Sequence, residues 1–193
     1  MNVQKIARRL LRATGWDFEG PVPAVPKCVA IAVPHTSNWD GVLMLAAAAA
    51  VGLDMSFMIK DDWLRGPMGP IMRKLGAVGI DRSKANNVVD GMVAELRHRD
   101  RLWLVIPPEG TRSRTEYWKS GFYHIARGAD VPLLLGYMDY RRKRIGLGGP
   151  LHLTGDVGAD MDAIRRFYAD KAPVAHVPAD FGPIRLKDEP TVN

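Results

Sequence analysis

Apolar, strand-like runs alternate with helical patterns along most of the chain, and this alternation constrains the fold more than any other feature. The expected strands are residues 28–33, 55–59, 77–80, 102–106 and 132–138. The expected helices are residues 41–51, 63–75, 86–99, 120–127 and 161–171. Strands separated by helices are typical of α/β domains, because each helix returns the chain to the start of a neighbouring parallel strand. We therefore predict an α/β fold with a single domain, built on a central, mostly parallel or mixed sheet flanked by helices.

The size and composition of the chain fit one globular domain. Its 193 residues suffice for one sizeable core, and 47% of them are hydrophobic. We expect an N-terminal helix and proline-rich linker over residues 1–27, the functional domain over 28–172, and a loosely packed C-terminal tail over 173–193. The single cysteine, Cys28, excludes an internal disulfide and suits a reducing compartment. No run reaches the roughly 20 apolar residues that a spanning helix needs, and arginines near the start argue against a signal peptide.

The net charge indicates an anionic partner: nucleic acid, an anionic membrane or a phosphorylated substrate. It is +6, with an isoelectric point of about 9.6. Residues 1–14 have the pattern of an amphipathic helix. Its apolar side holds Val3, Ile6, Ala7, Leu10 and Thr14, and its basic side holds Lys5, Arg8, Arg9 and Arg12. Such a helix either lies on an anionic membrane or packs its stripe on the domain, and both alternatives stay open. Trp16 and Phe18 favour the membrane, because aromatic side chains suit its interface.

A histidine and a carboxylate follow the first expected strand. His35 comes two residues after the strand ends, and Asp40 lies where a helix begins. If His35 lies in the turn before the helix, Asp40 can fold back to one imidazole nitrogen and leave the other free to take a proton. No serine or cysteine nucleophile is evident beside the pair, so the activated hydroxyl would belong to the substrate. The alternative is structural: Asp40 favours the positive end of the helix, and Ser37 or Asn38 caps it.

A second polar cluster, Glu109–Arg112, follows the most strand-like run of the chain. Gly110 allows backbone N–H groups to approach a ligand closely. Arg112 offers a planar guanidinium that matches a phosphate, and Glu109 could orient it. Ligands of α/β sheets bind beyond the carboxyl ends of the strands, so this cluster and His35 are expected to converge. The alternative is a surface turn held by a Glu–Arg pair.

The sequence resembles the glycerolipid acyltransferase family, the lysophosphatidic acid acyltransferase-like enzymes, in four ordered blocks. They are H-x4-D at residues 35–40, a G-x-x-x-I-x-R type block at 76–82, E-G-T-R at 109–112 and a Val-Pro strand start at 131–132. Gly79 stands where the family usually has an aromatic residue, and Lys60, ahead of a proline-broken helix, also fits the pattern. The resemblance covers about residues 28–138 and implies a glycerol-3-phosphate acyltransferase-like fold.

The resemblance also implies roles for residues. His35 would be the general base and Asp40 its orienting partner. The base would take a proton from the acceptor hydroxyl, which attacks the carbonyl of an acyl thioester, either acyl-CoA or an acyl-carrier protein. The implied substrate-binding residues are Lys60, Arg82, Glu109, Gly110, Thr111 and Arg112. Backbone N–H groups around Gly110 are the expected donors to the developing oxyanion. No metal and no cofactor besides the thioester co-substrate are expected.

We therefore expect an O-acyltransferase of phospholipid biosynthesis that moves a fatty acyl group to a hydroxyl of a lysophospholipid, such as 1-acylglycerol-3-phosphate, or of a related lipid. We expect it in the cytoplasm, peripheral on the inner face of the cell membrane, which residues 1–14 would contact. Two rivals stay open: an esterase or thioesterase using the same dyad on water, and a non-catalytic module that binds anionic lipid.

Other motifs are missing from the sequence. It has no Gly-x-Ser-x-Gly elbow, no phosphate-binding loop of the Walker type and no zinc-spaced Cys/His cluster. It also lacks an aromatic-laced basic strand, so no nucleic acid partner is expected. The remaining histidines, which no motif surrounds, are interpreted as structural or surface residues: His98, His124, His152 and His176.

Overall fold

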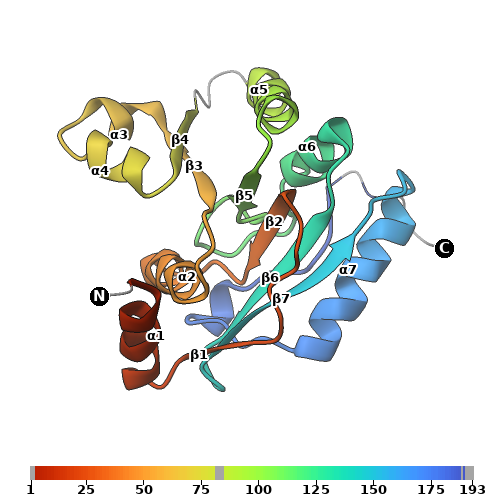
Figure 1. Cartoon of the computed structure of the whole chain (residues 1–193). Coiled ribbons are helices and arrows are strands. Elements are labelled where there is room, and N and C mark those ends of the chain that lie inside the picture. Colours follow the sequence, from red (N-terminus) through yellow and green to blue (C-terminus); the bar gives the residue numbers. More distant parts are fainter. Residues whose placement is uncertain (1–2, 81–84, 188, 190–193) are drawn as a thin grey trace.

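A seven-stranded sheet runs through the molecule (Figure 1). The computed structural model describes residues 3–80, 85–187 and 189. The strands are β1 (Asp17–Glu19), β2 (Lys27–Val33), β3 (Ser56–Lys60), β4 (Ala77–Ile80), β5 (Leu102–Ile106), β6 (Leu133–Asp139) and β7 (Arg144–Leu151). Their order is β1-β7-β6-β2-β5-β3-β4, and every neighbouring pair is parallel except β6 and β7. The prediction of an α/β fold on a mostly parallel sheet is confirmed.

Helices cover both faces of this sheet (Figure 1). They are α1 (Val3–Ala13), α2 (Asn38–Val51), α3 (Asp61–Arg65), α4 (Gly69–Lys74), α5 (Ala85–His98), α6 (Gly121–Ala129) and α7 (Val157–Lys171). Side chains of α5, α6 and α7 pack on one face, which we name the α7 face. Those of α2 pack on the other, the α2 face. The short α3 and α4 lie at the edge formed by β3 and β4 (Figure 1).

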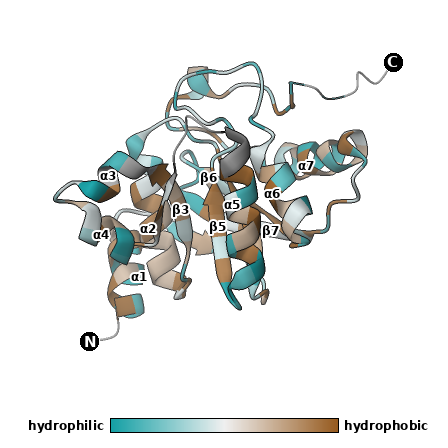
Figure 2. Cartoon of the chain, turned by 90° about the horizontal axis from the view of Figure 1, so that it is seen from above, coloured by the Kyte–Doolittle hydropathy of each residue, from teal (hydrophilic) through white to brown (hydrophobic). Residues whose placement is uncertain are grey.

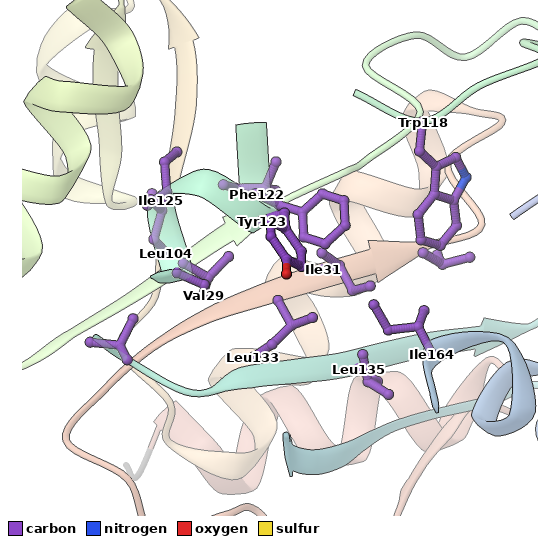
Figure 3. Close-up of a cluster of buried hydrophobic side chains, with 14 of the residues drawn as sticks. Val29, Ile31, Leu104, Trp118, Phe122, Tyr123, Ile125, Leu133, Leu135 and Ile164 are labelled. Atoms are coloured by element: carbon purple, nitrogen blue, oxygen red, sulfur yellow. The ribbon is translucent and has the colours of Figure 1, made fainter. Parts of the chain in front are cut away.

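The two faces differ in the size of their side chains, because successive residues of a strand point to opposite sides. Strand residues on the α7 face are Val29, Ile31, Val33, Leu102, Leu104, Ile106, Leu133, Leu135 and Tyr137. Figure 3 shows this cluster with Phe122 of α6 and Ile164 of α7. On the α2 face, β2 instead contributes Cys28, Ala30 and Ala32. The central strand β2 therefore carries bulky side chains on the α7 face and small ones on the α2 face.

Two strands, β1 and β7, were not expected from the sequence. β7 has the sequence RIGLGGPL, and three of its eight residues are glycine. Glycine has low β propensity, so no apolar alternation marks the run. β1 has only three residues and lies in the segment assigned to a linker. Both strands form because a neighbour supplies the pairing: β7 pairs with β6, and β1 with β7.

Helix α1 packs on α2 and still leaves apolar side chains uncovered. Leu11 is buried in a cluster with Ala47 of α2, and the Arg8 guanidinium donates to the carbonyl of Ala50 at 3.4 Å. Val3 and Leu10 stay 69% and 65% exposed, and Figure 2 shows hydrophobic colour on α1 at the lower edge of the molecule. The apolar stripe of α1 is therefore only partly covered by its packing on the domain. No helix in the described part of the chain is both long and apolar enough to cross a membrane.

The aromatic residues after α1 point inward. Trp16 is buried, and its ring meets that of Tyr140 edge-on with the centroids 4.9 Å apart. Phe18 is half-buried and lines a cavity beneath α2. The interpretation of these two residues as membrane-interface aromatics is therefore wrong: both belong to the interior.

Residues 173–187 pack against the domain more closely than the expected loose tail. The N–H of Val177 donates to the hydroxyl of Thr36 at 3.2 Å, which ties the segment to the turn after β2. The N–H of Trp118 donates to the carbonyl of Arg185 at 2.8 Å, which ties it to the loop after β5. The segment therefore contacts the turn of the first polar cluster and the loop that carries the second.

Candidate active site

The turn after β2 is fixed by hydrogen bonds to the first residues of α2. The hydroxyl of Ser37 accepts the N–H of Trp39 at 2.9 Å. The carboxylate of Asp40 accepts the N–H groups of Thr36 and Ser37 at 2.6 and 2.7 Å. Together these bonds form a capping box, so Ser37 is the helix cap. The same bonds hold Asp40 close to His35, so the structural and the functional interpretation of this turn are compatible.

His35 lies in this turn, just outside α2. Its Nδ1 is 3.7 Å from Oδ2 of Asp40, which is longer than a hydrogen bond, but such contacts often tighten only when substrate binds. Burial lowers the pKa of His35 most, the charge of Asp40 raises it, and Arg112 lowers it, so that the pKa lies below its ordinary value of 6.5. The imidazole is therefore neutral at pH 7, and its Nε2 can accept a proton.

Glu109 reaches the same turn from the loop after β5. It is 3% exposed, and its Oε1 accepts the N–H of His35 at 3.1 Å, where we expected it to orient Arg112. Its Oε2 has no hydrogen-bond partner among the described residues. Burial raises the pKa of Glu109 to about 7, although backbone N–H donors lower it and the charge of Asp40 raises it further. A buried carboxyl with one unpaired oxygen costs stability, and perturbed groups of this kind concentrate at functional sites.

Arg112 joins the two polar clusters at the rim of the site. Its guanidinium donates to Oδ1 of Asn38, the first residue of α2, and its charge lowers the pKa of His35. Arg112 and Thr111 are both exposed, and the hydroxyl of Thr111 accepts the N–H of Ser113 at 3.3 Å. The structure thus brings Arg112 beside His35, where its guanidinium can meet an anionic group of a ligand.

Gly110 makes the turn between these residues. Its φ of 65° is left-handed, which glycine adopts readily, and a Cβ there would lie 2.9 Å from the side chain of Lys119. Its N–H donates to the carbonyl of Pro107 at 3.2 Å. The expectation that this N–H stabilises an oxyanion is therefore not supported for Gly110 itself, because the turn already uses the donor.

Two expected binding residues cannot be placed by their side chains. Lys60 ends β3, whose carboxyl end lies at the same edge of the sheet as the ends of β2 and β5. Its side chain is not among those described, and Arg82 lies outside the described residues. Their part in binding stays a prediction. Among residues 3–80, 85–187 and 189, no three His, Cys, Asp or Glu side chains gather where they could hold a metal ion.

An apolar cavity of about 260 Å³ lies between α2 and the sheet, and His35 and Asp40 form part of its wall. Small residues make the room, among them Ala30, Ala48 and Gly136. Other lining residues include Met44, Leu45, Leu53, Met55, Phe57, Trp103 and Val105. Enclosed apolar pockets with a few polar groups on their wall are typical ligand sites. The apolar lining suits a hydrocarbon chain, and the imidazole of His35 forms part of the wall.

One residue that touches the pair, Tyr140, was not predicted from the sequence. The hydroxyl of Tyr140 donates to Oδ1 of Asp40 at 2.5 Å. The two residues lie 100 positions apart, and no motif surrounds Tyr140. Only the fold brings them together, because β6 runs beside β2 and ends just before Tyr140.

The fold and the site define a class: an α/β protein with a histidine–aspartate pair at the carboxyl ends of parallel strands, on the wall of an apolar cavity. The family model described as Acyltransferase matches residues 18–134, well over half of the chain. The chain therefore belongs to the acyltransferase family, and the resemblance to glycerolipid acyltransferases is confirmed.

A solved structure supports the same fold. The 1-acyl-sn-glycerophosphate (LPA) acyltransferase PlsC from Thermotoga maritima matches with a TM-score of 0.62 and 16% identity, over 88% of this chain and 78% of that chain. At this identity the match shows the fold alone. A search of the curated proteins found no match.

Proposed function

We propose that the protein transfers a fatty acyl group from an acyl thioester, either acyl-CoA or an acyl-carrier protein, to a hydroxyl of a lysophospholipid such as 1-acylglycerol-3-phosphate or a related lipid. This step belongs to phospholipid biosynthesis. The observation that carries the proposal is the neutral imidazole of His35 on the wall of an apolar cavity. Membership of the acyltransferase family supports it, as does the fold shared with an enzyme described as an LPA acyltransferase.

In the proposed reaction His35 is the general base. Its Nε2 takes the proton of the acceptor hydroxyl while the hydroxyl oxygen bonds to the thioester carbonyl carbon. When the tetrahedral intermediate collapses, the C–S bond breaks and the thiolate takes the proton from the imidazolium. Asp40 orients the ring and stabilises its charged form. The acceptor supplies the nucleophile, and the step uses no metal or cofactor besides the thioester.

The cavity beneath α2 would hold the acyl chain. Its lining is almost entirely apolar, and each methylene moved from water into such a site contributes about 0.8 kcal/mol. With the chain in the cavity, the thioester carbonyl would lie near His35, which is the positioning that transfer requires.

Arg112 would bind the phosphate of the acceptor at the rim. It is exposed, it lies beside His35, and a guanidinium can hold a phosphate through two parallel hydrogen bonds. We assign Lys60, Arg82 and Thr111 to the same anionic group, and Glu109 to holding the His35 turn. Gly110 would shape the loop that carries Arg112.

The test supplies acyl-CoA with a panel of lysophospholipids and glycolipids to wild type, His35→Ala and Arg112→Ala. His35→Ala should lower turnover about 10²- to 10⁴-fold, the usual contribution of a general base. Arg112→Ala should raise the KM for phosphorylated acceptors and leave that for unphosphorylated ones unchanged. Free fatty acid released without acceptor would favour the thioesterase instead. Transfer undiminished in His35→Ala would contradict the proposed base.

We also propose that the protein is cytoplasmic and binds the anionic inner face of the cell membrane through α1. Val3 and Leu10 are exposed there beside the basic side chains of the helix, a combination that suits an anionic interface. Leu10→Ser should weaken binding to vesicles that contain anionic lipid, measured by co-sedimentation. Ala13→Ser, at another exposed position of α1, is the matched control and should bind as wild type. Equal binding by wild type and Leu10→Ser would contradict the proposal.

A further inference from the structure

Tyr140 provides the only side-chain hydroxyl bonded to Asp40 in the described part of the chain. Its O–H donates to Oδ1 at 2.5 Å. The other oxygen, Oδ2, accepts the N–H groups of Thr36 and Ser37 and faces Nδ1 of His35. Each oxygen of the carboxylate therefore has its own donors, and the bond from Tyr140 adds a restraint on Oδ1 to those that the backbone places on Oδ2.

The phenol of Tyr140 is protonated at neutral pH. Burial raises the pKa of its phenol, and the hydrogen bond to Asp40 raises it further. A phenol that stays protonated is a permanent donor. The bond therefore delocalises part of the Asp40 charge towards Tyr140 and away from His35.

The ring of Tyr140 is held on two sides. The ring of Trp16 meets it edge-on with the centroids 4.9 Å apart, and the ring of His176 tilts against it at 4.8 Å. The N–H of Tyr140 also donates to the carbonyl of Val174 at 2.8 Å. All four residues lie outside residues 18–134, the part that the family model matches. The segments before and after the matched region thus meet at this one side chain.

We propose that Tyr140 is a positioning residue of the His35–Asp40 pair. It holds the plane of the Asp40 carboxylate so that Oδ2 faces Nδ1 of His35. It also sets how strongly that carboxylate stabilises the imidazolium, and Trp16 and His176 hold its ring in place. This role rests on the proposed function, in which His35 is the base.

Several titratable groups surround the pair and enter its pH dependence. Asp40 and His35 come from the turn after β2, Glu109 and Arg112 from the loop after β5. His176 comes from the C-terminal segment and faces the ring of Tyr140. A test must therefore change Tyr140 alone and leave the other groups in place.

Tyr140→Phe does this, because it keeps the ring between Trp16 and His176 and removes only the hydroxyl. A well-positioned general base contributes about 10²- to 10⁴-fold to turnover. Because the variant loses the bond that orients Asp40, and hence part of the positioning of His35, we expect kcat to fall by about 10-fold with the KM values unchanged. Without the hydroxyl, Asp40 presents more of its charge to His35, so the pKa of His35 should rise. The acid limb of kcat/KM should move to higher pH by the same amount.

Tyr123→Phe is the matched control. Tyr123 is a buried tyrosine whose hydroxyl, like that of the half-buried Tyr140, donates to a buried carboxylate, in this case that of Asp160 at 2.7 Å. Removing the Tyr123 hydroxyl should lower the free energy of unfolding. It should leave the pKa of His35 and the acid limb of kcat/KM unchanged. NMR titration of the imidazole signals, with His35→Ala to assign the His35 signal, measures the pKa without any assay of turnover.

The outcomes separate the two proposals. A His35 pKa that is equal in wild type and Tyr140→Phe, or a fall in kcat that Tyr123→Phe reproduces, would overturn the positioning role. If His35→Ala keeps wild-type transfer, the proposed base is wrong, whereas the NMR titration still decides whether Tyr140 sets the pKa of His35. If His35→Ala is inactive and Tyr140→Phe behaves as wild type, only the role of Tyr140 fails.

Discussion

The two faces of the sheet differ in how completely side chains fill the space between the sheet and its helices. On the α7 face, large side chains fill the space: Leu133, Phe122 and Ile164 have no exposed surface. On the α2 face, the central strand contributes Ala30 and Ala32, the facing helix has an alanine run, and a cavity of about 260 Å³ remains. The same alternating strands build both faces, and along the central strand the two faces differ in side-chain size.

The filled face and the face with the cavity are expected to contribute differently to stability and to function. Atoms that line a void lack contacts on one side and lose the dispersion energy that close packing gives. We therefore expect the α7 face to contribute more of the stability than the α2 face, which leaves open the space that we propose for the acyl chain. His35 lies on the wall of that space.

Removing a large side chain from the α7 face should have the largest effect on stability. Phe122→Ala should lower the free energy of unfolding by about 3–5 kcal/mol, because it removes buried apolar area and leaves a new cavity. Met44→Ala, on the half-buried lining of the existing cavity, should cost less than about 2 kcal/mol. Chemical denaturation measures both, and equal losses would remove the distinction between the faces.

Two buried carboxyls, Asp160 in α7 and Glu109 at the His35 turn, allow a second comparison. Asp160 supports the α7 side and accepts bonds from the hydroxyl of Tyr123 and from the N–H and hydroxyl of Thr154. Burial alone would raise its pKa, but these donors outweigh burial and hold the pKa below its ordinary value. Glu109 has an unpaired oxygen, and burial raises its pKa from 4.5 to about 7. The carboxylate of Asp160 therefore stabilises the fold through its hydrogen bonds, whereas the charged form of Glu109 destabilises it.

Glu109→Gln should therefore stabilise the protein at alkaline pH. The raised pKa means that the native state binds an extra proton between about pH 4.5 and 7, so the penalty is absent below this window and complete above it. At pH 8 the gain in unfolding free energy should approach about 3 kcal/mol, and at pH 4 it should be near zero. Denaturation at the two values measures it. A variant no more stable than wild type at pH 8 would contradict the pKa of Glu109.

Asp160→Asn is the opposite case. The lowered pKa of Asp160 contributes stability above the ordinary pKa of an aspartate, and this contribution is lost as the pH falls through the native value. The variant should be destabilised at neutral pH and approach wild type in acid. The same denaturation series measures it, and a loss that does not change with pH would show that the carboxylate charge is not the cause.

The smallest expected effect on stability comes from enlarging one alanine on each face of the sheet. Ala126 of α6 and Ala48 of α2 are both buried, and they lie on opposite faces of the sheet. Ala126→Leu should overpack the filled face and cost about 1–3 kcal/mol. Ala48→Leu adds the same atoms beside the cavity and should be near neutral. Denaturation curves of the two variants decide it, and an equal cost at both positions would mean that the cavity cannot accept the added atoms.

Most of the fold could be predicted from the sequence, because its central elements carry strong local patterns. β2, β5 and β6 consist mainly of apolar residues, and a buried parallel strand has that signature. β1 and β7 carry no such pattern, since one is three residues long and the other is rich in glycine. Their pairing depends on β6, which a local pattern cannot show.

The candidate site likewise contains features that local sequence predicts and features that depend on the fold. The turn from His35 to Asp40 could be predicted because the capping box and the pair lie within six consecutive residues. The convergence of Arg112 on that turn followed from the rule that ligands bind beyond strand ends. The bond from Tyr140 to Asp40 could not be predicted, because one tyrosine among five carries no motif. Nor could the occupied N–H of Gly110, since its partner depends on the conformation of the loop.

If the cavity and His35 form one site, chain length and catalysis must be coupled, and one measurement tests this most directly. It is the rate of acyl transfer to 1-acylglycerol-3-phosphate from palmitoyl-CoA and from hexanoyl-CoA, by wild type, Ala48→Leu and His35→Ala. We predict that Ala48→Leu lowers kcat/KM for the long chain by about 10- to 50-fold, since the leucine displaces two or three methylenes, and leaves that for the short chain unchanged. We predict that His35→Ala loses both activities. An equal effect of Ala48→Leu on both chains, or transfer by His35→Ala at the wild-type rate, would contradict a single site.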